Sequence, residues 1–265
     1  MPASDALYLR VIDASANRAC EALRVIEDFV RFVHDDAFLS ENFKNLRHRL
    51  VQNVLKFPMP ERLANRETQA DVGTQISTRT EFLRSSLQDV LDANFSRLQE
   101  SLRSLEEFSK LTQPETAHEF EQMRYASYTL QRVVFFTLAD DSPRRQALRK
   151  VQNAERVPSS AEVRLTGSDG LTLRLATDLT VASAEDRDGF LLETPSDART
   201  VKSARAALGV EKLIGVQVSD EASARQALLT GIDFLLVPTP TLSVPSSPLL
   251  LLLRRLTNVP TLPLI

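Results

Sequence analysis

The first part of the chain has the hydrophobic periodicity of helices. Long stretches carry apolar residues at spacings of three and four, and only one of the seven glycines, Gly73, interrupts the first 150 residues. Four prolines break these stretches: Pro58, Pro60, Pro114 and Pro143. The pattern predicts an all-helical bundle over residues 1–140.

The second part has a different pattern, in which short apolar runs alternate with amphipathic segments from Val163 onward. Strands are predicted for Leu171–Ala176, Gly189–Leu192, Leu213–Val218 and Asp233–Val237. Helices are predicted for Ser196–Leu208 and Asp220–Leu229. This alternation predicts a βα domain with a mainly parallel sheet over residues 161–265. The charged stretch 141–160, with Pro143 and Pro158, is expected to be a linker.

An internal repeat marks the helical part. The segment from Asp13 reads D-A-x-x-x-R-x-x-E-x-L-R-x-x-E-D-F, and the segment from Asp92 reads D-A-x-x-x-R-x-x-E-x-L-R-x-x-E-E-F. Eight of twenty positions are identical at an offset of 79 residues. We therefore predict a duplicated helix unit whose copies pack about a pseudo-twofold axis.

The repeated helix is amphipathic. One side of the first copy is expected to be buried: Ala19, Ala22, Leu23, Ile26, Phe29, Val30 and Val33. The opposite sides are polar: Asp13, Asn17, Glu21, Arg24, Asp28 and Arg31 in the first copy, and Asp92, Ser96, Glu100, Arg103, Glu107 and Lys110 in the second. Such stripes form either a solvated surface with ion pairs worth about 0.2–0.5 kcal/mol each, or the walls of a shared cleft. In a cleft, the arginines would bind phosphate and the carboxylates would hold Mg²⁺ or orient a hydroxyl.

A polar stretch between the copies, Arg66–Thr74, contains Gly73 and ends on a threonine. It is either an ordinary turn or a loop whose amides, Thr74 hydroxyl and nearby Arg66 receive an anion. Further candidates for a polar site are Arg47 with His48, and the group Arg124, Tyr125 and Tyr128.

Composition narrows the function classes. The chain is 43% hydrophobic and 25% charged, with a net charge of −3, which excludes a disordered chain and gives no overall attraction to nucleic acid or anionic lipid. A single cysteine, Cys20, excludes an internal disulfide. The chain has neither the G-x-x-x-x-G-K-[ST] nor the G-x-G-x-x-G motif for nucleotides. We expect a cytoplasmic protein that has no nucleic-acid or membrane partner.

Several blocks of the first part resemble the helical domain commonly fused to thiamine-phosphate synthase. They are IDASANRACEALRVIEDFVRFV, LRHRL, R-x-x-x-x-D-V-G-T and LDANFSRLQESLRSLEEFSKL. The resemblance implies a kinase that uses ATP and Mg²⁺ to convert hydroxymethylpyrimidine phosphate to the diphosphate. The matching positions are Asn17, Arg18, Glu21, Arg24, Arg66, Asp71, Gly73, Arg97, Glu100 and Arg103.

Roles for these residues follow from their chemistry. Glu21, Glu100 and Asp71 are the catalytic candidates, and Glu21 and Asp71 are also the candidates for binding Mg²⁺. The candidates for binding substrate or phosphate are Asn17, Arg18, Arg24, Arg66, Gly73, Thr74, Arg97 and Arg103.

The second part resembles thiamine-phosphate synthase itself, a (βα)₈ barrel, with altered motifs. Leu191 takes the place of the histidine in the family's D-G-V-H-L, Gln217 replaces the serine of I-I-G-V-S, and Leu242 replaces the lysine of T-x-T-K. The segment Pro260–Ile265 aligns with the strand that leads into the family's phosphate loop. We therefore expect a partial, non-catalytic barrel with an open edge, which the helical domain, a second copy or the Pro238–Pro263 tail would cover.

Three hypotheses for the function follow. The leading one is the pyrimidine phosphate kinase. The alternatives are thiamine-phosphate synthase, which couples the pyrimidine diphosphate to thiazole phosphate, and a non-catalytic protein that binds a metabolite or partner of the same pathway. A homodimer or a complex with a thiamine-phosphate synthase is the expected assembly.

Overall fold

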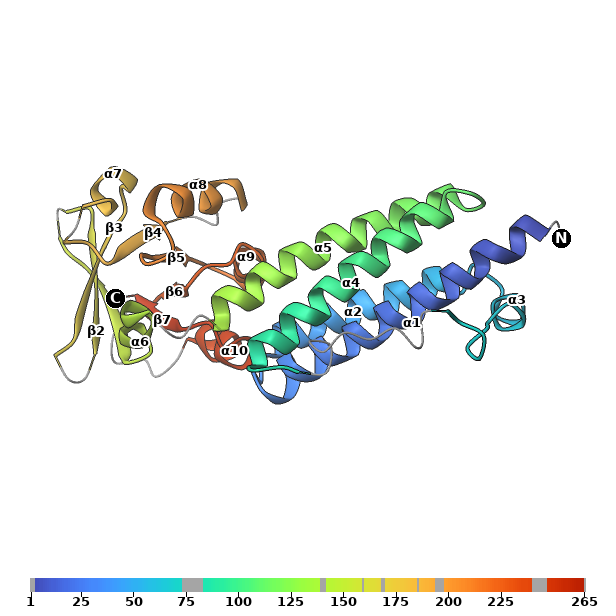
Figure 1. Ribbon diagram of the computed structural model, residues 1–265. Helices are drawn as coiled ribbons and strands as arrows, with labels where there is room; N and C mark the ends of the chain where they lie inside the picture. Colours follow the sequence, from blue (N-terminus) through green and yellow to red (C-terminus); the bar gives the residue numbers. More distant parts are fainter. Residues whose placement is uncertain are drawn as a thin grey trace. The chain divides into compact units, whose positions relative to one another are not determined.

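The computed structural model describes residues 3–72, 83–138, 142–158, 160–167, 170–184, 186–193, 198–239 and 247–264. The chain forms two compact units, one all-helical and one built around a β-barrel (Figure 1). The first unit comprises residues 1–35 and 39–128, and the second comprises residues 36–38 and 129–265.

Helices build the first unit, as the sequence predicts. They are α1 (Ala3–Phe32), α2 (Ala37–Val54), α3 (Met59–Ala64), α4 (Leu87–Ser109) and α5 (Pro114–Leu138), of which the residues from Thr129 onward belong to the second unit. The long helices α1, α2, α4 and α5 lie side by side as a bundle (Figure 1). Helix α4 begins where the hydroxyl of Ser86 accepts a hydrogen bond from the amide of Asp89 at 3.1 Å, a side-chain N-cap.

The two helices that carry the repeat, α1 and α4, pack against each other. The predicted apolar side of α1 is buried, and its alanines Ala19 and Ala22 are both fully buried. Val33 is the exception: it is 57% exposed, because α1 ends at Phe32 and the helical phase is lost there. Each fully buried leucine or phenylalanine in such a core contributes about 1.5–3 kcal/mol.

The second unit contains a closed barrel. Its strands are β1 (Val151–Arg156), β2 (Glu162–Gly167), β3 (Thr172–Ala176), β4 (Gly189–Leu192), β5 (Leu213–Gln217), β6 (Phe234–Pro238) and β7 (Thr261–Leu264). Its helices are α6 (Pro143–Leu148), α7 (Leu179–Ala182), α8 (Ala198–Leu208), α9 (Glu221–Leu228) and α10 (Pro248–Leu256). The strands β1, β2 and β3 pair antiparallel, whereas β3 to β7 are parallel and β7 pairs parallel with β1.

The expectation of a partial barrel with an open edge is wrong. The stretch 141–160, expected to be a linker, contains α6 and β1, and β1 closes the sheet by pairing Ala154 with Leu264. The tail expected to cap an edge contains α10 and the closing strand β7 instead. Only Val151 and Ala154 of β1 are buried, so the strand is too polar for its sequence to stand out.

The interior of the barrel is filled with hydrocarbon side chains. They come from α6 and all seven strands: Leu148, Val151, Ala154, Val163, Leu165, Leu173, Leu175, Leu191, Leu213, Phe234, Leu236, Leu262 and Leu264. Gly215 leaves room for the ring of Phe234, because a Cβ atom built on Gly215 would lie 2.0 Å from Cζ of that ring. A polar site in this barrel therefore belongs to one of its ends.

The outer face of β2 and β3 is polar. Glu162 accepts hydrogen bonds from Arg164 at 2.8 Å and from Arg174 at 3.0 Å, and it pairs with Arg187 at 3.2 Å. These contacts hold the pKa of Glu162 down at about 2, chiefly through the hydrogen bonds from Arg174 and Arg164. Because this face carries ion pairs, it needs no apolar cover.

Candidate functional site

The candidate residues of the repeated helices lie on the surface of α1 and α4. The exposed ones are Asn17, Arg18, Glu21, Arg24, Arg97, Glu100 and Arg103. Arg24 and Arg103 each pair with a glutamate three positions further along the same helix, and Arg103 also pairs with Glu107. The structure thus gives the polar stripes as exposed helix faces, except at Asp13, which is 2% exposed, while the buried sides of α1 and α4 meet each other.

Two buried glutamates anchor these arginines. Glu27 on α1 pairs with Arg24 at 3.6 Å and accepts a hydrogen bond from Nε of Arg47, on α2, at 2.7 Å. Glu27 is 5% exposed. The glutamate is a buried link between α1 and α2.

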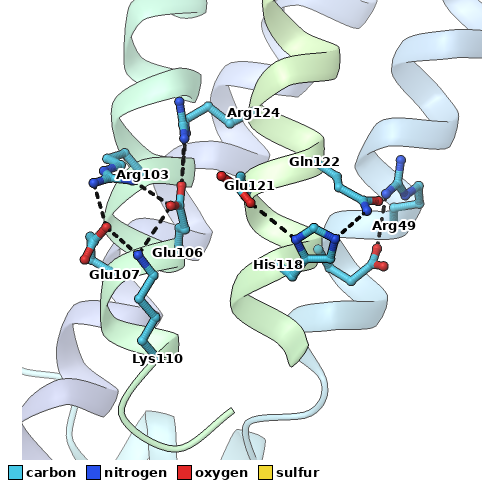
Figure 2. A network of polar contacts seen from close by, with 10 residues as sticks. Arg49, Arg103, Glu106, Glu107, Lys110, His118, Glu121, Gln122 and Arg124 are labelled. Carbon is cyan, nitrogen blue, oxygen red and sulfur yellow. Dashed lines mark hydrogen bonds and ion pairs between the residues drawn. The ribbon is translucent and has the colours of Figure 1, made fainter. Parts of the chain in front are cut away.

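Glu106, at the equivalent position of α4, is surrounded in the same way (Figure 2). It is 3% exposed and accepts hydrogen bonds from Arg103 at 2.6 Å and from Arg124, on α5, at 2.9 and 3.1 Å. Lys110 adds an ion pair at 3.5 Å and donates to the exposed Glu107 at 2.8 Å, a hydrogen bond that raises the pKa of the lysine. Both repeat-related helices therefore share one arrangement of a buried glutamate and two arginines.

Glu27 and Glu106 are not among the predicted site residues, because they lie at the border between the polar and apolar sides of their helices. The repeat could have pointed to them: the two copies carry glutamate at this same position, and each glutamate directly precedes an acidic residue of the predicted polar stripe. A carboxylate at that border can turn inward and bind an arginine of the next helix.

Asp13 forms a third buried anchor. Its carboxylate accepts hydrogen bonds from Nη1 of Arg62 at 3.1 Å and from Arg66, whose Nε and Nη2 donate at 2.7 and 3.0 Å. Arg62 is buried, whereas the side chain of Arg66 is 42% exposed. Asp13 therefore fixes the start of the predicted anion loop onto α1.

The rest of that loop is described only in part. Arg10 approaches Asp71 at 3.8 Å, and Glu67 accepts hydrogen bonds from the amides of Gln69 and Ala70 at 2.8 and 3.0 Å. The bonds from Ala70 and Gln69 lower the pKa of Glu67. Gly73 and Thr74 lie outside the described residues. Among the residues that are described, no cluster of three or more acidic, histidine or cysteine side chains is arranged to hold a metal ion.

The group Arg124, Tyr125 and Tyr128 presents aromatic rings at the surface. The two tyrosine side chains are 57% and 42% exposed, and their rings meet edge to face with centroids 6.3 Å apart. The guanidinium carbon of Arg124 lies 4.8 Å from the centroid of the Tyr125 ring and 6.0 Å from that of Tyr128. Arg124 therefore joins the buried Glu106 to an exposed aromatic pair.

A second polar cluster lies at the end of the barrel formed by the carboxyl ends of its parallel strands. Arg156, the last residue of β1, donates to Glu193 at 2.5 Å and to the side-chain oxygen of Gln217 at 2.8 Å. Glu193 follows β4 and Gln217 ends β5, and these strands are the farthest from β1 around the seven-stranded ring. Arg156 therefore reaches across the mouth of the barrel.

The positions at which the sequence departs from the family motifs lie in different parts of the barrel, one in its interior and one at its mouth. Leu191, two residues before Glu193 in the chain, is fully buried in the apolar interior of the barrel. Gln217, in contrast, takes part in the polar cluster at the mouth. Leu242 lies outside the described residues. Asp178, another acidic residue near this end, caps α7 by accepting from the amides of Thr180 and Val181 at 2.9 and 3.1 Å.

The opposite end of the barrel holds a structural ion-pair cluster. Asp233, 6% exposed, accepts hydrogen bonds from Arg145 at 2.8 Å, from Arg205 at 2.6 Å and from the amide of Ile214 at 2.7 Å. Arg205 also stacks over Phe136, with 4.8 Å between guanidinium carbon and ring centroid. In parallel barrels this end supports stability, and the carboxyl end carries the chemistry.

Comparison with known proteins gives consistent matches for both parts. Residues 10–133 match the ThiD2 family. A thiamine-phosphate synthase of Nostoc punctiforme is 33% identical over 258 residues, which cover 85% of this chain and 71% of that protein. A thiamine-phosphate synthase of Thermosynechococcus vestitus is 41% identical over 155 residues, or 58% of this chain and 42% of the relative.

A more distant relative, the thiamine-phosphate synthase of Rhodopirellula baltica, is 29% identical over 263 residues, covering 86% of this chain and 70% of its own. No solved structure gives a significant match. In the part of the chain that the structure describes, no helix is both long and apolar enough to cross a membrane.

Proposed function

Because the chain belongs to the thiamine-phosphate synthase family, we propose that its barrel unit couples a pyrimidine diphosphate to a thiazole phosphate to form thiamine phosphate. The chain is a protein of thiamine biosynthesis, and its relatives are transferases. This proposal departs from the expectation that the second half has no catalytic role.

The observation that carries the proposal is the position of Arg156. A coupling of this kind releases diphosphate, so the site has to stabilise negative charge on the leaving group. Arg156 spans the carboxyl-end mouth of the barrel, where enzymes with parallel barrels act, and its planar guanidinium matches phosphate oxygens. Glu193 and Gln217 hold the guanidinium over the mouth, so that phosphate binds to a cation already in place.

The altered motif positions predict a slow reaction. Leu191 provides no polar group to the interior, and Leu242 replaces a lysine that would add a second cation. With fewer donors for the departing diphosphate, we expect turnover at least tenfold below that of the relatives, since losing one such donor costs about 10²–10³ in rate.

The test is direct. The purified full chain is incubated with hydroxymethylpyrimidine diphosphate and thiazole phosphate, and thiamine phosphate is quantified with each substrate omitted in turn. We expect product only when both substrates are present. No product above the substrate-omission controls would refute the proposal.

A second candidate function is the kinase reaction in the helical unit, favoured by the ThiD2 match over residues 10–133. Here ATP would donate a phosphoryl group to hydroxymethylpyrimidine phosphate. Mg²⁺ is usually bound by one or two carboxylates together with substrate phosphates, so it needs no cluster of three protein ligands. The exposed Glu21 and Glu100, together with Asp71, are the candidate carboxylates, and Arg66, held by Asp13, would bind a phosphate.

This candidate has its own measurement. The chain is incubated with ATP, Mg²⁺ and hydroxymethylpyrimidine phosphate, and the diphosphate is detected. Arg66→Ala should lower this activity at least tenfold, whereas Arg49→Ala, which removes an arginine paired with Glu119 on the surface of the same unit, should leave it within twofold. An equal loss in both variants would reject the role of Arg66.

A further inference from the structure

The surface around Glu106 combines cations with exposed aromatic rings. We call it the Tyr–Arg patch, and it consists of Arg103, Lys110, Arg124, Tyr125 and Tyr128 on α4 and α5. Figure 2 shows Arg103, Lys110 and Arg124 gathered around the carboxylate of Glu106 from three directions. The side chains of Arg103 and Lys110 are 54% and 51% exposed, so both are accessible to a ligand.

The local charge favours an anion. Three cationic side chains face two carboxylates, Glu106 and Glu107, which leaves one net positive charge on a chain whose overall net charge is −3. Glu106 and Arg124 are both nearly buried, so the accessible groups are Arg103, Lys110 and Glu107, which again carry one net positive charge. Arginine and lysine at such a surface bind phosphate oxygens through charge-assisted hydrogen bonds.

The other repeat provides an internal comparison. Around Glu27 the same frame is present in Arg24 and Arg47, with Arg31 at the position of Lys110. When Arg47 is aligned with Arg124, however, His48 and Val51 stand where Tyr125 and Tyr128 stand. The glutamate–arginine frame ties helices together in both copies, and it does so in the first copy without any aromatic pair.

The tyrosines therefore call for a separate explanation. Two rings that are 57% and 42% exposed and inclined at 61° to each other offer an angled apolar surface next to cations. Aromatic rings stack on such surfaces, and tyrosine does this at little entropic cost because it has few rotatable bonds. We infer that the Tyr–Arg patch binds the phosphate ester of a planar heteroaromatic ring, with the ring packed on Tyr125 and Tyr128 and the phosphate bound by Arg103 and Lys110.

This site is separate from the barrel mouth, and only the choice of ligand rests on the proposed function. The ligand class includes the pyrimidine phosphates of that pathway. In the same helical unit, the patch would hold the monophosphate that precedes the diphosphate consumed at the barrel.

Calorimetric titration of the full chain tests the inference with three probes: hydroxymethylpyrimidine phosphate, unphosphorylated hydroxymethylpyrimidine and inorganic phosphate. We expect the ester to bind at least tenfold more tightly than either fragment. Tyr125→Leu/Tyr128→Leu and Arg103→Gln/Lys110→Gln should each weaken its binding at least tenfold. The matched variants of the first repeat, Val51→Ala and Arg31→Gln, should leave it within twofold.

The inference fails if the ester does not bind, or if the matched variants weaken binding as much as the patch variants. It also fails if the patch is an interface between copies, in which case Tyr125→Leu/Tyr128→Leu would convert a dimer to a monomer without any ester binding to the wild type. Thiamine phosphate formation from preformed diphosphate separates the two proposals. Tyr125→Leu/Tyr128→Leu should retain that turnover, and ester binding without turnover would refute the barrel proposal alone.

Discussion

Glu106 on α4 accepts two hydrogen bonds from the guanidinium of Arg124 on α5, with Nε and Nη2 at 3.1 and 2.9 Å from the same carboxylate oxygen. Glu27, 79 residues earlier, accepts from Arg47 on α2 at 2.7 and 3.5 Å. Each of the two repeat-related helices is thus tied to the helix that follows it by a buried carboxylate and a nearly buried arginine.

Loss of either buried carboxylate should destabilise the helical unit. Glu106→Gln and Glu27→Gln each remove the charge that compensates a nearly buried arginine, so we expect the free energy of unfolding to fall by roughly 1–3 kcal/mol. All three tyrosines of the chain, Tyr8, Tyr125 and Tyr128, lie in the first unit, and the chain has no tryptophan. Urea unfolding followed by tyrosine fluorescence therefore reports on the helical unit.

The matched control is Glu107→Gln. Glu107 neighbours Glu106 and also pairs with Arg103 and Lys110, but its side chain is 43% exposed. An exposed pair contributes only about 0–1 kcal/mol, so this variant should shift the transition little. A shift as large as that of Glu106→Gln would contradict the buried anchor.

Most of the fold could be predicted from the sequence, because strong periodicity reflects burial. The apolar side of α1 and the strands from β3 to β6 were predicted close to their observed bounds. Strand β1 was not, since it has only two buried residues and one of its two neighbours is the distant β7, with which Ala154 pairs through Leu264. Closure of a barrel depends on such long-range pairing, which local patterns do not encode.

The candidate site was harder to predict for a similar reason. Periodicity showed that Arg24 and Arg103 lie on polar faces, but not that buried glutamates hold them. Arg156 at the barrel mouth was not singled out at all, because its partners Glu193 and Gln217 lie 37 and 61 residues away in the sequence. Only the barrel geometry brings the three side chains together.

The interior of the barrel should not tolerate a side chain at position 215. In Gly215→Ala the new methyl group would overlap the ring of Phe234, and overpacking of this kind costs about 1–3 kcal/mol. Calorimetry should show a lower melting temperature for the barrel unit, while the tyrosine-detected transition of the helical unit stays unchanged.

A second variant, Phe234→Leu, tests whether overlap with the ring of Phe234 causes the loss of stability. It shortens the side chain that occupies the space above Gly215, so the double variant should be more stable than the sum of the two single effects predicts. Strict additivity of the two losses would show that Phe234 is not what limits position 215.

Acid should weaken the barrel through Glu162. The folded pKa of about 2 is below the ordinary value of 4.5, so the unfolded chain binds the proton more readily. The stabilisation by the three arginines is therefore fully present above about pH 4.5 and is lost as the pH falls toward 2. The pKa difference sets an upper bound of about 3 kcal/mol, and solvent screening of the partly exposed arginines lowers the expected contribution to roughly 1 kcal/mol.

Thermal unfolding of the wild type and Glu162→Gln measures this contribution. The wild type should lose more stability between pH 5 and pH 2.5 than the variant, whose side chain does not titrate. Parallel pH profiles of the two proteins would rule out Glu162 as a source of the acid sensitivity.

If Arg156 makes the barrel mouth a site for coupling, its removal has to slow the formation of thiamine phosphate. Thiamine phosphate formation is measured for the wild type, for Arg156→Ala and for Arg164→Ala, which removes an arginine from the outer face of β2. We expect a loss of about 100-fold for Arg156→Ala and less than a twofold change for Arg164→Ala. Equal turnover of wild type and Arg156→Ala would contradict this role of Arg156.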